Sequence, residues 1–255
     1  MADPFLVAES VTVRFGGLIA VADVSLEADR GEVVGVIGPN GAGKTTLFGA
    51  IAGTVRPERG EIRLGGQDVT RWASHRRARA GLSRTFQRLE VFGSMSVREN
   101  LCYATEAAAL GASPLRLFRR SAHRRDDVAD RTLEELGLRS VAHERAGDLP
   151  PGLGRLVELG RALCADPAML LLDEPSSGLD VAETAALAER VSSAVATRDL
   201  GVVLIEHDMS MVLGVCSRLY VLDFGACIAA GPAATVARLE IVRDAYLGTT
   251  VDAAG

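Results

Sequence analysis

The sequence has almost no lysine. Of its 28 basic residues, Lys44 is the only lysine and the rest are arginines. A coding bias toward arginine accounts for the arginines, but so strong a bias makes the one remaining amine a candidate for a role that arginine cannot fill. The 33 acidic residues leave a net charge of −5, which gives no electrostatic reason to expect nucleic acid as a partner.

Cysteine and long apolar runs are also scarce. Cys102, Cys164, Cys216 and Cys227 form neither a CxxC pair nor a metal-ligand spacing, so we expect buried, reduced thiols in a cytosolic protein. The first residues lack the basic and apolar pattern of a signal peptide, and no apolar run approaches the ~18 residues of a membrane span. We therefore expect a soluble, cytoplasmic chain.

The rest of the pattern predicts an α/β protein. With 255 residues, 48% of them hydrophobic, the chain is long enough for one large domain with a sizeable core. Buried apolar strands alternate with helices after residue 165, which argues for a mainly parallel sheet. The expected strands are 6–15, 21–28, 33–38, 168–173 and 201–206, with hairpins at 60–69 and 218–231, a helix at 182–198 and helical character over 90–165.

A glycine-rich loop follows the strand expected at 33–38. The letters GPNGAGKT fit the pattern G-x-x-x-x-G-K-[ST], with a strand before and a helix after. In this pattern the loop N–H groups wrap a phosphate chain at a helix N-terminus. The predicted phosphate-binding residues are Gly38, Pro39, Asn40, Gly41, Ala42, Gly43, Lys44, Thr45 and Thr46.

Two side chains of this loop have predicted roles. Lys44 is placed to reach the β- and γ-phosphates, and the Thr45 hydroxyl to bind Mg²⁺. An arginine is too bulky and forked for such a cradle, which accounts for the single lysine. Without nucleotide we expect the Lys44 side chain to face solvent and to be unpaired.

Polar residues also follow the two later buried strands. Asp173 and Glu174 close the first of these strands, at the sheet edge where open α/β sheets bind ligands. There Asp173 can orient Mg²⁺ through water, and Glu174 can act as general base for an attacking water. Gln87, in SRTFQ, and His207, in IEHD, are unremarkable alone, and a lone histidine after a strand is more often structural.

Taken in order, these motifs resemble those of an ATP-binding cassette (ABC) ATPase. The motifs are the phosphate loop, Gln87, the acidic pair with SSGLD, and His207, and the resemblance covers the chain from Phe5 to Gly248. The resemblance implies a P-loop NTPase core (about 5–89 and 166–235) with a mainly parallel sheet, an N-terminal antiparallel β subdomain, a helical signature subdomain (about 90–165) and a C-terminal tail (236–255), all within one domain.

The resemblance also assigns roles. Phe15 matches the aromatic residue that stacks on adenine, and Gln87 the glutamine that contacts Mg²⁺ or the lytic water and links ATP to the membrane partner. Asp180 matches the D-loop aspartate, and His207 the histidine that holds the γ-phosphate. The implied cofactors are ATP and Mg²⁺. The implied partners are transmembrane permease subunits and a second cassette, with a periplasmic or extracellular solute-binding protein acting indirectly, at the cytoplasmic face of the membrane.

Finer features resemble one subfamily. The segments RFGGLIAVADVSL, RTFQ, LIEHDM and AYLG are similar to those of ATP-binding subunits of branched-chain amino acid importers. Importers of urea and short-chain amides have similar cassettes, so the solute stays open. The arginine-rich stretch at 116–125 reads as a solvated surface, with contact to anionic headgroups or a membrane partner as the alternative.

The signature motif departs from the family pattern. Where the family has L-S-x-G-Q, this chain has Leu149, Pro150, Pro151, Gly152 and Leu153, so the phosphate-binding serine is missing and only Leu149 and Gly152 match. Proline lacks an N–H but is tolerated in the first turn of a helix. We expect asymmetric sites in a heterodimer. An ATP-binding regulatory cassette with little hydrolysis is the alternative, and a non-transport cassette is disfavoured because neither a second cassette nor a long coiled coil is present.

Overall fold

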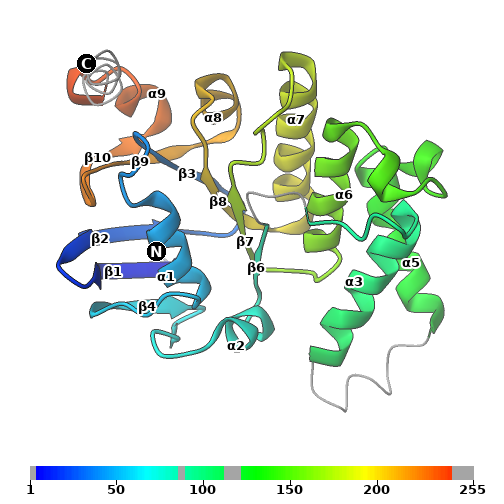
Figure 1. Cartoon of the computed structure of the whole chain (residues 1–255), viewed down its shortest axis with the longest axis horizontal. Coiled ribbons are helices and arrows are strands. Elements are labelled where there is room, and N and C mark those ends of the chain that lie inside the picture. The colour runs from blue at the N-terminus through cyan, green and yellow to red at the C-terminus, as the bar shows by residue number, and fades with distance from the viewer. Residues whose placement is uncertain (1–3, 86–89, 112–121, 243–255) are drawn as a thin grey trace.

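Two β-sheets and the helices around them make up the described part of the chain (Figure 1). The structure is a computed structural model that describes residues 4–85, 90–111 and 122–242. Gln87 lies outside the described residues, and so do the side chains of the stretch 116–125. The predictions made for both therefore stay predictions.

An antiparallel sheet is built from the N-terminal part of the chain, in the strand order β2-β1-β4-β5. Its strands are β1 (Leu6–Phe15), β2 (Leu18–Ala28), β4 (Arg59–Leu64) and β5 (Gln67–Asp68). The hairpin predicted at 60–69 is present, and Gly65 and Gly66 form its turn with positive φ angles of 54° and 77°. Such a turn needs glycine or asparagine, so the sequence is sufficient to predict this hairpin.

The second sheet is mainly parallel and has the order β10-β9-β3-β8-β7-β6. Among the described strands of this second sheet, only the pair β9–β10 is antiparallel. The strands are β3 (Val33–Ile37), β6 (Leu82–Arg84), β7 (Met169–Asp173), β8 (Gly201–Ile205), β9 (Arg218–Asp223) and β10 (Ala226–Pro232). Every residue of β3, β7 and β8 is buried, as expected for parallel strands covered on both faces. The α/β fold with a mainly parallel sheet is therefore confirmed.

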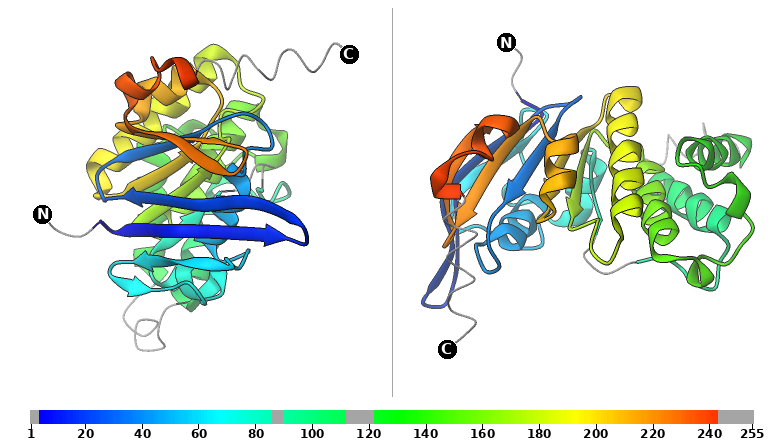
Figure 2. Two further views of the ribbon diagram at one scale, coloured as in Figure 1. Left: turned by 90° about the vertical axis from the view of Figure 1, so that its left-hand side faces the viewer. Right: turned by 90° about the horizontal axis from the view of Figure 1, so that it is seen from above.

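Helices cover the parallel sheet and extend beyond it. Figure 2 shows the antiparallel sheet at one end of the molecule and the helical region, with α3, α5 and α6, at the other. The helices are α1 (Lys44–Ala52), α2 (Ser74–Arg79), α3 (Val97–Gly111), α5 (Ala122–Glu135), α6 (Pro151–Leu163), α7 (Val181–Arg198), α8 (Met209–Val215) and α9 (Ala233–Val236), with 3₁₀ turns η1 (Arg139–Val141) and η2 (Ala146–Asp148). The elements α2 and β6 were not predicted.

Helix α1 packs between the two sheets. Its Leu47, Phe48 and Ile51 are fully buried in the core that the antiparallel sheet shares with β3, β7 and β8. A second core, on the other face of the parallel sheet, includes apolar residues of α5, α6 and α7. The packing of α1 in the first core fixes the loop in front of it relative to both sheets.

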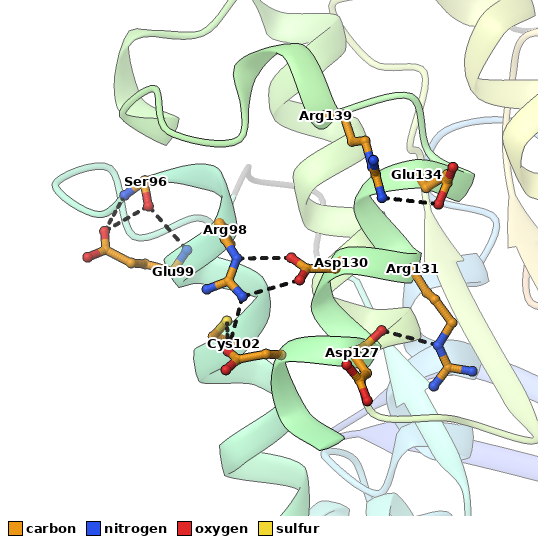
Figure 3. Close-up of polar contacts among 10 residues, drawn as sticks. Ser96, Arg98, Glu99, Cys102, Asp127, Asp130, Arg131, Glu134 and Arg139 are labelled. Atoms are coloured by element: carbon orange, nitrogen blue, oxygen red, sulfur yellow. Dashed lines mark hydrogen bonds and ion pairs between the residues drawn. The ribbon is translucent and has the colours of Figure 1, made fainter. Parts of the chain in front are cut away.

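An arginine joins two helices of the helical region (Figure 3). Arg98 on α3 donates to Asp130 at 2.9 Å and to Asp126 at 3.1 Å, both on α5, and these bonds raise the pKa of its guanidinium. Ser96 begins α3: its hydroxyl accepts from the Glu99 N–H, and the Glu99 carboxylate accepts from the Ser96 N–H. The Arg98 bonds fix how α3 and α5 lie against each other, while the Ser96–Glu99 bonds cap the start of α3.

Candidate nucleotide-binding site

The glycine-rich loop between β3 and α1, residues 38–46, is here called the phosphate loop. Gly38 has φ of +145°, and a Cβ there would lie 2.0 Å from the carbonyl oxygen of Leu222. Gly43 has φ of +95°, and a Cβ there would lie 2.3 Å from the carbonyl oxygen of Ala20. Glycine is thus required because strands on both sides touch the loop backbone.

The start of α1 is open to an anion. Gly43 is its N-cap and supplies no side-chain hydrogen bond, and the first turn contains no acidic residue. Most helices satisfy these first N–H groups with a capping side chain. Here the N–H groups and the positive end of the helix dipole are left for a ligand, which fits a phosphate group.

The Lys44 side chain does not face solvent, so that expectation was wrong. Lys44 is 7% exposed, and its Nζ donates to the carbonyl oxygens of Gly38 at 2.6 Å and Pro39 at 2.8 Å. Burial lowers the pKa of the ammonium, while the negative charges of Glu174 and Asp173 oppose that shift. A buried ammonium needs acceptors, and the phosphate loop itself provides them.

A cavity of about 490 Å³ opens in front of the phosphate loop. The cavity is lined by the phosphate loop, by apolar side chains of the β1–β2 and β9–β10 hairpins, and by one carboxylate. These residues are Phe15, Leu18, Ile19, Ala20, Asn40, Gly41, Ala42, Gly43, Lys44, Thr45, Thr46, Glu174, Phe224 and Gly225. Of the predicted site residues, Phe15, Glu174 and most of the loop therefore meet here. Asp173, Gly152, Asp180 and His207, all among the described residues, do not line it.

Asp173 is buried and ion-paired. It is 3% exposed, and one carboxylate oxygen accepts from the Arg84 guanidinium at 2.8 Å. Burial raises the pKa of the carboxyl group, and the Arg84 charge opposes the shift. The sequence analysis missed this partner, although Arg84 stands three residues before Gln87 in SRTFQ. The parallel pair β6–β7 brings Arg84 beside the end of β7.

Glu174 follows Asp173 with an unusual backbone. Its φ is +48°, a left-handed conformation that costs energy for a residue with a Cβ. Its N–H donates to the carbonyl oxygen of Ile205 on the neighbouring strand at 2.9 Å, and its own carbonyl accepts from Ser177. These bonds keep Glu174 at the cavity wall, where a general base would be required.

A buried carboxylate connects the segments that follow β7 and β8. Glu206 is fully buried and accepts backbone N–H bonds from Ser176 at 2.8 Å, His207 at 2.9 Å and Asp208 at 3.3 Å. The His207 side chain is mostly exposed and lies 3.8 Å from this carboxylate. Sequence reasoning passed over Glu206 because a glutamate before a histidine has no distinctive pattern. It positions both the acidic segment and His207.

The unusual signature forms the start of α6. Pro150 is the N-cap and Pro151 the first helical residue, so neither position offers an N–H. The Gly152 N–H donates to the Glu183 carboxylate at 3.2 Å. Glu183 also accepts from the Asp180 N–H, while Asp180 caps α7 by accepting from the Glu183 N–H at 2.8 Å. The sequence pattern D-x-x-E at 180–183 is typical of such a cap and could have revealed Glu183.

The acidic residues here fit a metal only together with a nucleotide. Among the described residues, no three His, Cys, Asp or Glu side chains gather into a metal-binding group. Mg²⁺, however, is normally held by one or two protein oxygens together with phosphate oxygens and waters. The exposed Thr45 hydroxyl at the cavity and the carboxylate of Asp173 could provide these one or two protein oxygens.

The fold and the phosphate loop define a P-loop NTPase of the α/β class. The chain belongs to the ABC transporter family: the family model described as "ABC transporter" matches residues 21–177. It is therefore an ATP-binding cassette ATPase. Within residues 4–85, 90–111 and 122–242, no helix has both the length and the apolar character needed to cross a membrane.

Known proteins match along almost the whole chain. The branched-chain amino acid transport ATP-binding protein BraF of Pseudomonas aeruginosa is 38% identical, with 97% of this chain and 99% of that protein covered. The lipopolysaccharide export ATP-binding protein LptB of Acidithiobacillus ferridurans is 36% identical, with 95% and 96% covered. A crystal structure of an ABC transporter cassette in its ADP conformation superimposes with a TM-score of 0.86, at 31% identity over 97% of this chain and 100% of that one.

Proposed function

We propose that this chain hydrolyses ATP to energise an ABC importer of branched-chain or related amino acids. The observation that carries the proposal is the 38% identity to BraF over 97% of the chain. The chain acts at the cytoplasmic face of the membrane, bound to transmembrane permease subunits, and a solute-binding protein delivers the solute from outside. Within its single domain, a core of about 5–89 and 166–235 binds nucleotide, about 90–165 is a helical subdomain, and 236–255 is a tail.

Each predicted site residue then has a role. The phosphate loop amides and Lys44 bind the β- and γ-phosphates, which requires the ammonium to leave the carbonyl oxygens of Gly38 and Pro39. Thr45 and Gln87 would hold Mg²⁺ and Asp173 would orient it through water, and its charge would offset that of the phosphates. Glu174 takes the proton of the attacking water, and His207 holds the γ-phosphate. Phe15, at the end of β1, stacks on adenine.

A second cavity supports the proposed docking of a permease subunit. It has about 350 Å³ and lies between β6, α3 and α6, with Arg84, Thr85, Glu90, Tyr103, Glu158 and Arg161 among its lining residues. Arg84 and Thr85, which precede Gln87 in the sequence, form part of the wall of this cavity. A permease segment seated here therefore touches the strand that carries the ion partner of Asp173, which couples docking to the nucleotide site.

Gly152 and Asp180 serve a neighbouring cassette. Both lie outside the cavity of their own chain, while Glu183 joins them to each other. A head-to-tail dimer places them against the partner's ATP. With two prolines and the Gly152 N–H occupied by Glu183, this signature offers little to a γ-phosphate. We therefore favour a heterodimer in which the site built on Lys44 and Glu174 is the active one.

Transport assays test the importer assignment. In the source organism, Glu174→Gln should abolish uptake of labelled leucine, isoleucine and valine, because the residue that activates water is lost while the side-chain shape is kept. Labelled urea and acetamide serve as alternative solutes. Loss of urea or amide uptake with normal leucine uptake would reassign the solute, and normal uptake of all of them would contradict an importer role.

The asymmetry has its own test. In the purified assembled complex, Glu174→Gln should abolish most ATP hydrolysis, whereas the matched glutamate change in the partner cassette should have a small effect. One lost transition-state donor costs ~3–4 kcal/mol, or about two to three orders of magnitude in rate, so the two sites should differ widely. Equal losses, or rapid hydrolysis by a homodimer, would show that the double proline does not disable the signature.

A regulatory cassette that binds ATP with little hydrolysis is the second candidate. The contact between Glu183 and the Gly152 N–H favours it, because a carboxylate occupies a position that a phosphate would need. If it is correct, the wild-type complex and its Glu174→Gln variant should hydrolyse ATP at the same low rate. ATP affinity measured by calorimetry should still be normal in both.

A further inference from the structure

Exposed apolar side chains gather around the nucleotide cavity. Ten large hydrophobic residues are exposed in the described part of the chain, and four of them line this one cavity: Phe15, Leu18, Ile19 and Phe224. Phe15, Leu18 and Ile19 come from the β1–β2 hairpin, and Phe224 from the turn between β9 and β10. An exposed apolar cluster beside a phosphate loop suits a ligand with one charged end and one flat, apolar end.

Phe224 sits in a conformation that phenylalanine disfavours. It is 91% exposed, and its φ is +43°, followed by +83° at Gly225. Two positive φ angles in a two-residue hairpin are the mark of a type I′ turn, whose first position normally holds Asn, Asp or Gly. Neither packing nor turn geometry thus explains an aromatic ring at this position. A strained residue at a cavity points to a role in binding.

The turn that carries Phe224 is fixed to the phosphate loop. The Gly225 N–H donates to the carbonyl oxygen of Ala42 at 3.1 Å, and the Gly225 carbonyl accepts from Ala22 on β2 at 2.8 Å. The end of β9 also touches the loop, since the Leu222 carbonyl lies against Gly38. The distance between the aromatic side chain and the phosphate-binding groups is therefore set by backbone contacts.

We propose that Phe224 is a second aromatic wall for the nucleobase, in addition to Phe15. The inference rests on the proposed binding of ATP and adds a base-contacting residue from a different sheet. When the phosphates bind the loop, the base lies among the apolar side chains of the cavity, whose lining includes the rings of Phe15 and Phe224. An aromatic side chain stacks on any nucleobase. Phe224 therefore increases the affinity for the nucleotide more than it selects adenine over other bases.

Calorimetry with two ligands tests this role. ATP and inorganic tripolyphosphate share the phosphate chain, but only ATP has a base. Phe224→Ala should weaken ATP binding about five- to tenfold, at the lower end of what a base–aromatic contact contributes. Its affinity for tripolyphosphate should stay at the wild-type value, and Phe224→Tyr should bind ATP like the wild type. Leu213→Ala, at an exposed apolar position on α8 outside the cavity, is the matched control and should change neither affinity.

A further variant separates binding from folding. Phe224→Asn removes the ring but suits the left-handed turn, so it should melt at or above the wild-type temperature while binding ATP as weakly as Phe224→Ala. Wild-type ATP affinity in Phe224→Ala would overturn the inference and leave the proposed function intact. An equal loss of affinity for ATP and for tripolyphosphate would also overturn the inference alone, because it would indicate a distorted phosphate loop. A wild-type protein that binds no ATP would instead overturn the proposed function.

Discussion

The ion pair between Arg84 and Asp173 allows the most quantitative prediction. Arg84→Met keeps most of the side-chain volume and removes the charge that faces a carboxylate buried to 3% exposure. Leaving a buried charge without its partner costs about 3–5 kcal/mol. Because the Arg84 side chain is itself 15% exposed, some solvent reaches the pair, and we expect a loss of about 3 kcal/mol in the free energy of unfolding near pH 8.

The size of the loss should depend on pH. Burial already raises the pKa of Asp173, and Arg84 opposes that shift most strongly, with a smaller opposing effect from the Lys44 charge. Without that guanidinium the folded-state pKa rises further above the unfolded value of about 3.9. A carboxyl group with a raised folded pKa destabilises the fold fully above that pKa, and the penalty disappears as pH falls toward the unfolded value. The variant should therefore approach wild-type stability in acid.

Urea unfolding measures this directly, because Trp72 is the only tryptophan and is partly buried in the core next to α1. The single variants Arg84→Met and Asp173→Asn and the double variant form a mutant cycle. The double variant should recover part of the lost stability, since no buried charge remains. A loss under about 1 kcal/mol for Arg84→Met, or the same loss at pH 5 and pH 8, would refute the reasoning.

Three further changes have expected outcomes. Lys44→Ala should weaken ATP binding at least about 100-fold by calorimetry, since bonds to charged groups contribute about 1.5–3 kcal/mol each. It should also lower the melting temperature without nucleotide, because the carbonyl oxygens of Gly38 and Pro39 lose the hydrogen bonds of the Lys44 ammonium. An unchanged ATP affinity would remove the phosphate-loop assignment. Glu206→Ala should lower the unfolding free energy by at least about 1.5 kcal/mol, because the buried Ser176 N–H and two partly buried N–H groups lose their acceptor. Glu206→Gln should lose less, and equal losses would mean that these bonds contribute little. Arg98→Ala should cost about 0.5–1 kcal/mol, as its ion partners Asp126 and Asp130 are half exposed, and a loss above about 2 kcal/mol in urea titrations would contradict a surface role.

Local patterns predicted the elements that have local causes. The phosphate loop is one contiguous run between a strand and a helix, so its glycines and Lys44 are visible without any tertiary information. Strands β3, β7 and β8 are buried on both faces and therefore read as unbroken apolar runs. The short strand β6 and helix α2 were missed, because three and six residues are too few to show a period.

Contacts between distant segments were decided only by the tertiary structure. The parallel sheet brings the ends of β6, β7 and β8 to one edge, and so pairs Arg84 with Asp173, 89 positions away, and Glu206 with Ser176, 30 positions away. Packing of α6 against α7 likewise places Glu183 on the Gly152 N–H, and the β9–β10 turn places Phe224 in the cavity of Phe15. The sequence alone determined the glycine-rich loop around Lys44 and predicted that it binds a phosphate chain. Which side chains surround that site depends on strand order, because strand order sets which distant residues become neighbours.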